Sequence, residues 1–195
     1  DAFTNGVERR IDTAEVNEVY LKLLNAATSR GLPDKDYEAR REAAARFAAD
    51  DRSSLAHMLR GTTMTHRDWL AVNERRHRLR LIWDEFFRDY DLLVCPAVPV
   101  VAFPHMAEGS GVHSDQLFRR IVIDGQPAPY LDFTWQGLAL IANLPATVMP
   151  TGKFADGLPT GLQIIGAHRE DRSVIRFAEL AEQAAGAFVV PPALA

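Results

Sequence analysis

Hydrophobic positions recur with a helical period in the first half of the chain. In residues 13–29, 34–50 and 65–87, apolar side chains follow one another at steps of three and four, which places them on one face of an α-helix. The third segment begins at Thr65-His-Arg-Asp68, an approximate capping box. The second has only a thin apolar stripe. The pattern therefore predicts three helices, the second of them mostly solvated.

Short apolar runs in the second half predict strands instead. Leu92–Cys95 is a continuous apolar run closed by a proline, which is typical of a strand buried on both faces. Thr147–Met149 and Gly161–Ile165 are two further short strands, separated by an Asp-Gly turn. Arg119–Asp124, which runs into a glycine, indicates a strand that enters a hairpin turn. We expect the first three strands to form one sheet.

Two helices are expected beside these strands. Pro129–Asn143 has an apolar pattern with proline near its first turn, a position that helices tolerate. Asp171 is placed to cap a final helix that packs on the sheet through Val174, Ile175 and Ala178. Strands covered by helices predict an α/β fold, a mixed β-sheet flanked by helices with a helical N-terminal segment.

Composition narrows the class of partner. The chain has 195 residues, 47% of them apolar and 25% charged, with a net charge of −4. This balance argues against nucleic acid or an anionic membrane surface as the main partner. No signal peptide or membrane-spanning apolar run is visible, so we expect a cytoplasmic protein. The single cysteine, Cys95, lies in the apolar run and is expected to act as a small core residue.

The histidines do not indicate a metal site. His105 and His113 flank a Gly-Ser-Gly stretch, but their spacing fits no known ligand motif. His57, His66 and His77 lie at helical intervals among charged residues, where a solvent-exposed position is expected. We therefore predict neither a metal nor a cofactor.

A family resemblance becomes visible in the second half. Three stretches carry it: Asp91-Leu-Leu-Val-Cys-Pro96, the run from Phe133-Thr-Trp-Gln to Pro150-Thr-Gly152, and Gly157-Leu-Pro-Thr-Gly-Leu-Gln-Ile-Ile-Gly166. Together they resemble the C-terminal part of amidase-signature enzymes, which hydrolyse carboxamides. The resemblance covers most of residues 84–192. It implies that residues 1–90 form a helical segment and residues 91–195 a sheet-completing C-terminal segment of one amidase-signature domain.

The catalytic apparatus of that family is missing from this chain. The family uses a Lys and two Ser in a Gly/Ser-rich stretch, whereas Lys22, Lys35 and Lys153 stand ahead of no such stretch. The one serine pair, Ser53-Ser54, precedes an apolar helical pattern and is expected to cap a helix. The resemblance thus implies that no catalytic residue lies in this chain, that the Ser-Ser-Lys segment lies in a missing N-terminal part, and that the isolated chain is inactive.

The resemblance also suggests part of a substrate pocket. Residues at the start of the helix before the Pro-Thr-Gly strand would form an apolar wall with polar tips for an amide: Asp132, Phe133, Trp135 and Gln136. Alternatively, the two aromatic residues are core packing and the glutamine lies on the helix surface. The chain departs from many family members by having Leu140 and Asn143 where those have Asn and Gly, so their substrates cannot be transferred to it.

Three functions remain open from the sequence. The first is an amidase that hydrolyses a carboxamide to a carboxylate and ammonia or an amine through an acyl-serine intermediate. The second is an amidotransferase A-type subunit, which needs a partner subunit. The third is a non-enzymatic interaction domain. The expected partners are the missing N-terminal half of the fold, a small-molecule amide and, where an apolar face is left open, a second copy of the chain.

Overall fold

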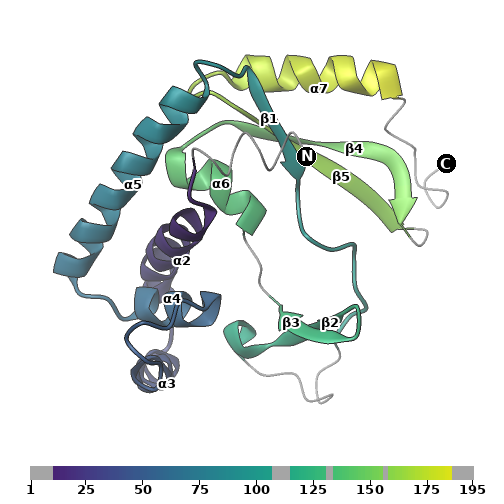
Figure 1. The fold of residues 1–195 in the computed structure, drawn as a ribbon. Helices are drawn as coiled ribbons and strands as arrows, with labels where there is room; N and C mark the ends of the chain where they lie inside the picture. The colour runs from purple at the N-terminus through teal and green to yellow at the C-terminus, as the bar shows by residue number, and fades with distance from the viewer. Residues whose placement is uncertain (1–10, 107–114, 131–133, 156–157, 186–195) are drawn as a thin grey trace.

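The first part of the chain is helical and the second combines strands with two helices, as the computed structural model shows (Figure 1). The structure describes residues 11–106, 115–130, 134–155 and 158–185. The helices are α2 (Thr13–Thr28), α3 (Asp34–Ala45), α4 (Ser54–Thr62), α5 (His66–Phe86), α6 (Thr134–Ala142) and α7 (Asp171–Ala185), with short 3-10 turns η1 (Ser29–Gly31) and η2 (Gln116–Phe118). The strands are β1 (Leu92–Pro96), β2 (Arg120–Ile123), β3 (Gln126–Pro129), β4 (Ala146–Ala155) and β5 (Leu158–Gly166).

Hydroxyl side chains cap two of the N-terminal helices. The backbone N–H of Ala56 donates to Ser53 Oγ at 3.3 Å at the start of α4. The N–H of Asp68 donates to Thr65 Oγ1 at 3.2 Å at the start of α5. Each bond satisfies one of the donors that a helix leaves free in its first turn. Both predicted helix starts are confirmed.

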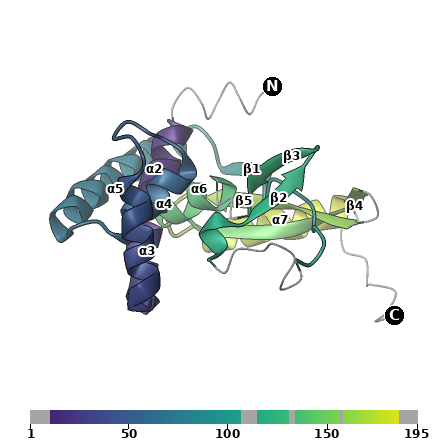
Figure 2. The ribbon, with the colours of Figure 1, turned by 90° about the horizontal axis from the view of Figure 1, so that it is seen from below.

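The helix α3 is mostly solvated, as expected. None of its residues is buried, and Figure 2 shows it projecting from the edge of the helical layer. It ends at Ala45, five residues before the predicted end at Asp50. The residues that follow form turns, because a helix with only a thin, partly buried apolar stripe gains little from further extension.

The three expected strands form one antiparallel sheet in the order β1-β5-β4. Ile164 of β5 stands opposite Val94 of β1 on one side and Thr147 of β4 on the other. The predicted sheet is confirmed, and β4 and β5 extend beyond the predicted segments. One expectation for β1 was wrong: Leu93 and Cys95 are buried, but Val94 is 39% exposed, since one face of this strand is only partly covered.

The hairpin β2-β3 lies apart from the main sheet (Figure 1). Its turn residues Asp124 and Gly125 have φ of 49° and 76°, the left-handed pair that a two-residue hairpin turn requires. This confirms the predicted hairpin. Pro129 belongs to β3 and pairs with Arg120 of β2, so the prediction that a helix begins at Pro129 was wrong. A proline fits an edge strand because it has no N–H to leave unpaired, and the first described residue of α6 is Thr134.

Two clusters of apolar residues hold the chain together. The larger one joins α2, α4, α5 and α6 to one face of the sheet, with Trp83 and Phe86 among its fully buried members. The smaller one consists of Met149, Ile164 and Val174, through which α7 covers the other face, with Ala178 packed against them. Ile175 was also expected in this contact, but it is 53% exposed, since it lies one residue away from the buried stripe of α7.

Candidate functional site

Two of the four predicted pocket residues are described, and both lie in the first turn of α6. Asp132 and Phe133 lie outside the described residues. Trp135 is half-buried and packs against the larger core cluster. Gln136 is also half-buried, and its Oε1 is buried without a hydrogen-bond partner among the described residues. An unpaired buried acceptor is unfavourable by about 1–3 kcal/mol, which makes Gln136 a candidate for binding a donor.

A glutamine from the sheet reaches the same turn. The Gln163 side-chain Nε2 donates to the Trp135 carbonyl oxygen at 3.0 Å and contacts Cys95 Sγ at 3.4 Å. Cys95 is buried, as predicted, and burial raises the pKa of its thiol, which makes it unreactive. The sequence analysis did not select Gln163. The available signal was a single polar residue inside the apolar run of β5.

On its other side α6 is in close contact with α2. A Cβ added at Gly137 would lie 2.9 Å from Cδ1 of Tyr20, so only glycine permits this approach. The buried position raises the pKa of the Tyr20 hydroxyl. The start of α6 is therefore held between the sheet and α2.

The end of α6 explains one of the departures from the family. Asn143, where the family resemblance implies a glycine, has a φ of 55° and follows the last helical residue. The Leu144 N–H donates to the Ala139 carbonyl at 3.0 Å. This bond, from a residue to the fifth before it, is that of a Schellman motif, in which the helix ends at a residue with a left-handed backbone. Asparagine tolerates this conformation better than other residues with a Cβ. The other departure, Leu140, is an exposed apolar side chain on the same helix.

A cavity with a mixed polar and apolar lining borders Tyr20. It has a volume of about 600 Å³ and lies between α2, α3 and η2. The side chain of Arg40 crosses from α3 to Asp115 with two bonds, Nε to Oδ2 at 2.7 Å and Nη2 to Oδ1 at 2.8 Å. Asp115 also accepts the N–H of Leu117, so the pair fixes the start of η2. Such paired, largely buried charges are already neutralised and do not by themselves attract a ligand.

A second cavity, of about 260 Å³, is almost wholly apolar. It lies between the extended segment 98–103 and the inner face of the hairpin, where Ile121, Ile123 and Ala128 line it. The rings of Phe103 and Tyr130 meet edge to face there, 5.8 Å apart. Neither cavity was predictable from the sequence, because each is closed by segments far apart in the chain.

None of the described serines is arranged as a nucleophile. Ser29 Oγ donates to the Ala26 carbonyl, and Ser53 caps α4. Ser54 Oγ accepts from the Asn17 side chain at 3.2 Å. The remaining described serine, Ser173, donates to the carboxylate of Glu170, the residue just before its helix. An activated serine needs a base within hydrogen-bond distance, and the bonds of these four described serines involve neither Lys nor His.

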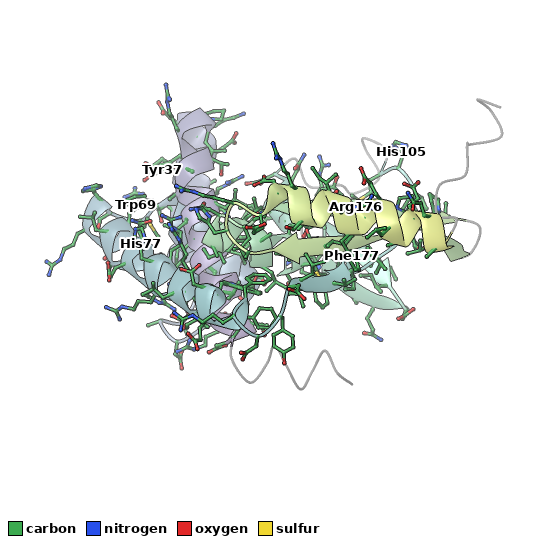
Figure 3. The ribbon with its side chains drawn as sticks, turned by 90° about the horizontal axis from the view of Figure 1, so that it is seen from above. Tyr37, Trp69, His77, His105, Arg176 and Phe177 are labelled. Atoms are coloured by element: carbon green, nitrogen blue, oxygen red, sulfur yellow. The ribbon has the colours of Figure 1, made fainter. Side chains whose placement is uncertain are left out.

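The described histidines are arranged as separate residues. His77 and His105 are exposed and lie at opposite ends of the molecule (Figure 3), and His66 is exposed and stacks on Trp69. His57 was expected at the surface but is buried, because α4 turns it toward α2, and burial lowers its pKa. His113 lies outside the described residues. Within the described ranges, no group of three potential ligands is placed to hold a metal ion.

None of the helices in the described part of the chain is long and apolar enough to cross a membrane.

Comparison with known proteins agrees with the fold. The Amidase family model matches residues 12–175. The chain belongs to the amidase family. Among its curated relatives is the A subunit of the glutamyl-tRNA(Gln) amidotransferase of Methylocella silvestris, to which it is 30% identical over 170 residues, covering 83% of this chain and 31% of that protein. It is 37% identical over 126 residues to the protein of the same name from Granulibacter bethesdensis, covering 65% and 22%.

Solved structures give the same result for the architecture. A crystal structure of an amidase matches 89% of this chain and 36% of its own length, with a TM-score of 0.58 and 23% identity. A bacterial aryl acylamidase of the amidase-signature family matches 89% and 34%, with a TM-score of 0.57 and 17% identity. The expected α/β amidase-signature fold is confirmed. The chain spans about a third or less of the length of these relatives.

Proposed function

We propose that this chain is the C-terminal part of an amidase that hydrolyses a carboxamide to a carboxylate and ammonia or an amine. In this proposal a Ser-Ser-Lys apparatus outside the chain forms the acyl-enzyme, and this chain supplies part of the fold and of the substrate pocket. The observation that carries the proposal is the amidase family match along residues 12–175. The arrangement of the described serines, all engaged in helix contacts, agrees with a nucleophile located elsewhere.

The proposed pocket wall consists of Asp132, Phe133, Trp135 and Gln136. Two features of α6 support it. The buried Gln136 Oε1 is an acceptor that an amide N–H of a substrate would satisfy. The indole of Trp135 is half-buried, so part of its apolar surface remains free for contact.

The proposed partner of this chain is the N-terminal half of the amidase fold. We treat residues 1–90 and 91–195 as two segments of one domain, since the larger core draws on both. The rest of the fold would cover the outer edges of β1 and β4, which have no neighbouring strand among the described residues. Without it, those edges favour self-association. The proposed location is the cytoplasm.

Activity measurements test the proposal directly. The isolated 195-residue chain is expected to release no ammonia or amine from a panel of carboxamides and to form no adduct with a serine-directed fluorophosphonate. The complete protein is expected to do both. A stoichiometric adduct on any serine of the isolated chain would contradict the proposal, because the nucleophile would then lie within it.

The pocket wall has a separate test in the complete protein. Trp135→Ala is expected to change kcat/KM more for amides with large acyl groups than for small ones, by about tenfold, because the lost contact is apolar surface. The contrary result is a marked fall in melting temperature with the ranking of substrates unchanged. Trp135 would then be a core residue only, consistent with its contact with the larger cluster.

A second candidate function is that of an amidotransferase A-type subunit. The observation that favours it is the name of the curated relatives, which are A subunits of glutamyl-tRNA(Gln) amidotransferase. Such a subunit would have to assemble with partner subunits to act. Size measurement of the complete protein purified from its source separates the two, since an amidase would be active without any other polypeptide. A complete protein that neither hydrolyses carboxamides nor forms an adduct with the fluorophosphonate would favour the interaction domain instead.

A further inference from the structure

Gln163 is unusual for its position in the main sheet. It is 5% exposed and stands opposite Cys95 on β1 and Val148 on β4, in the middle of three strands. Among the described residues of these strands, no other side-chain amide or charged group is buried. A buried amide is unfavourable unless it is hydrogen-bonded, whereas an apolar side chain would fill the same space without this cost. The polar group therefore calls for an explanation beyond packing.

The bond from Gln163 joins the sheet to one particular turn. Its Nε2 lies 3.0 Å from the carbonyl oxygen of Trp135, the second described residue of α6. A carbonyl oxygen has two lone pairs, so it accepts this side-chain N–H besides the bond along the helix. The contact of the same Nε2 with Cys95 Sγ at 3.4 Å restricts the rotation of the amide. The direction of the bond is thus determined by β1 and β5 together.

The first turn of α6 is held from the opposite side as well. Gly137 packs against the Tyr20 ring of α2 so closely that an added Cβ would lie 2.9 Å from it. The helix can therefore neither move toward α2 nor, while the Gln163 bond exists, move away from the sheet. Residues Trp135 and Gln136 lie between these two contacts.

We infer that Gln163 is a positioning residue that fixes the substrate-facing turn of α6 through the Trp135 carbonyl. This inference rests on the proposed function, because it takes Trp135 and Gln136 as pocket wall. Gln163 itself touches no substrate. It acts by keeping the apolar wall where the acyl group of the substrate contacts it, so that loss of the bond weakens the binding of large acyl groups.

The test uses the complete protein with Gln163→Met, which keeps the length of the side chain and removes both N–H donors. The matched control is Leu162→Met, at the neighbouring residue whose side chain packs on the α7 side of the sheet. Gln163→Met is expected to raise KM for large-acyl amides by about threefold to tenfold relative to small ones, with kcat changed less, because one hydrogen bond is lost. Leu162→Met should leave this ratio unchanged.

A merely structural role would give a different pattern. In that case Gln163→Met would lower the melting temperature and leave the ratio of KM values for large and small amides as in the wild type, and the inference would be wrong. Hydrogen exchange supplies a readout that needs no turnover. Exchange in the peptide covering residues 134–142 should quicken by about threefold or more in Gln163→Met, while a peptide from α7 stays unchanged.

The two measurements also separate this inference from the proposed function. If the wild-type protein hydrolyses no amide, the proposed function fails, and the exchange experiment still decides whether Gln163 holds α6. Unchanged exchange in residues 134–142 would overturn the inference whatever the activity. Faster exchange with an unchanged KM ratio would show that α6 moves without consequence for the substrate, and would overturn it too.

Discussion

The helical part and the sheet of this molecule differ in how completely they bury their own surfaces. In α2, the residues Val16 and Val19 are almost entirely buried within the larger core cluster. In the sheet, Val148 of β4 is 57% exposed, and Val94 of β1 is exposed on the other face. Both strands also have an outer edge without a neighbouring strand among the described residues. The interior of the helical part is closed, although Leu70 and Leu81 of α5 are 51% and 67% exposed. The sheet combines exposed apolar residues with two open edges, a combination that favours contact with more protein.

The polar contacts show the same contrast. The carboxylate of Glu18 on α2 accepts from Lys22 Nζ at 2.6 Å and from Arg75 Nη1 of α5 at 2.9 Å. Arg75 also donates to Glu15 at 3.1 Å. The bonds and charges of Arg75 and Lys22 lower the pKa of Glu18 to about 2. The partly buried charges of the helical part are therefore paired with one another. In the described part of the main sheet, the buried amide is that of Gln163.

The largest effect is expected where α2 and α4 cross. A Cβ added at Gly61 would lie 2.5 Å from the Lys22 carbonyl oxygen, a backbone atom that cannot move aside. Alanine is a better helix former than glycine by about 1 kcal/mol, but the clash outweighs this gain. We expect Gly61→Ala to lower the free energy of unfolding by about 3 kcal/mol in urea titrations.

Gly31→Ala is the matched control, because nothing lies within 4 Å of its added Cβ. It should leave stability unchanged or raise it by about 0.5 kcal/mol. Equal effects of the two substitutions would show that the contact of α2 with α4 is not as close as the structure has it.

The next largest effect is expected from Glu18→Gln. The substitution leaves the Lys22 ammonium without its carboxylate and Arg75 with that of Glu15 alone, which should lower the free energy of unfolding by about 2 kcal/mol at about pH 7. The folded pKa of Glu18, about 2, lies below the ordinary value of 4.5 for this carboxyl. Its stabilisation is therefore present above about pH 4.5 and is lost as the pH falls toward about 2.

Urea unfolding at several pH values checks this sign. The difference between wild type and Glu18→Gln should shrink steadily between about pH 5 and about pH 2.5. The control is Glu15→Gln, whose carboxylate is more exposed and makes one bond to the same arginine. A difference that stays constant over this range would mean that the Glu18 carboxylate is not stabilised by the network.

The contrast between the two parts also explains which features could be predicted from the sequence. Features set by neighbouring residues were predicted correctly: the hydroxyl caps at Ser53 and Thr65, the Asp124-Gly125 turn, and three strands from their apolar runs. Periodicity does not reveal how far a face is covered. The exposure of Val94 depends on what lies over the sheet, and no local pattern encodes it.

The candidate site was predictable only in part for the same reason. The family resemblance identified the helix start that contains Trp135 and Gln136. It could not select Gln163, whose role depends on a contact 28 positions away in the chain. His57 was misjudged because the charged residues around it in sequence suggested solvent, whereas α4 packs it against α2. Long-range contacts of this kind have no signature in a single sequence.

The smallest change in the stability of the isolated chain is expected from a substitution at Val148. This substitution distinguishes a sheet that is covered by further protein in the complete molecule from one that is not. Val148→Thr keeps the branched shape and adds a hydroxyl. At 57% exposure it should change the free energy of unfolding of the isolated chain by no more than about 0.5 kcal/mol. Ile165→Thr, at a fully buried position on the same face, should instead cost about 2 kcal/mol or more.

The complete protein should respond differently to the same substitution. If the remainder of the amidase fold covers β4, Val148→Thr buries a hydroxyl there and should destabilise the complete protein by about 1–3 kcal/mol. In the isolated chain it should also weaken any self-association seen by analytical ultracentrifugation, because the apolar patch beside the open edge becomes more polar. An equally small effect in both proteins would show that this face of β4 meets water in each, and the sheet would then be complete as it stands.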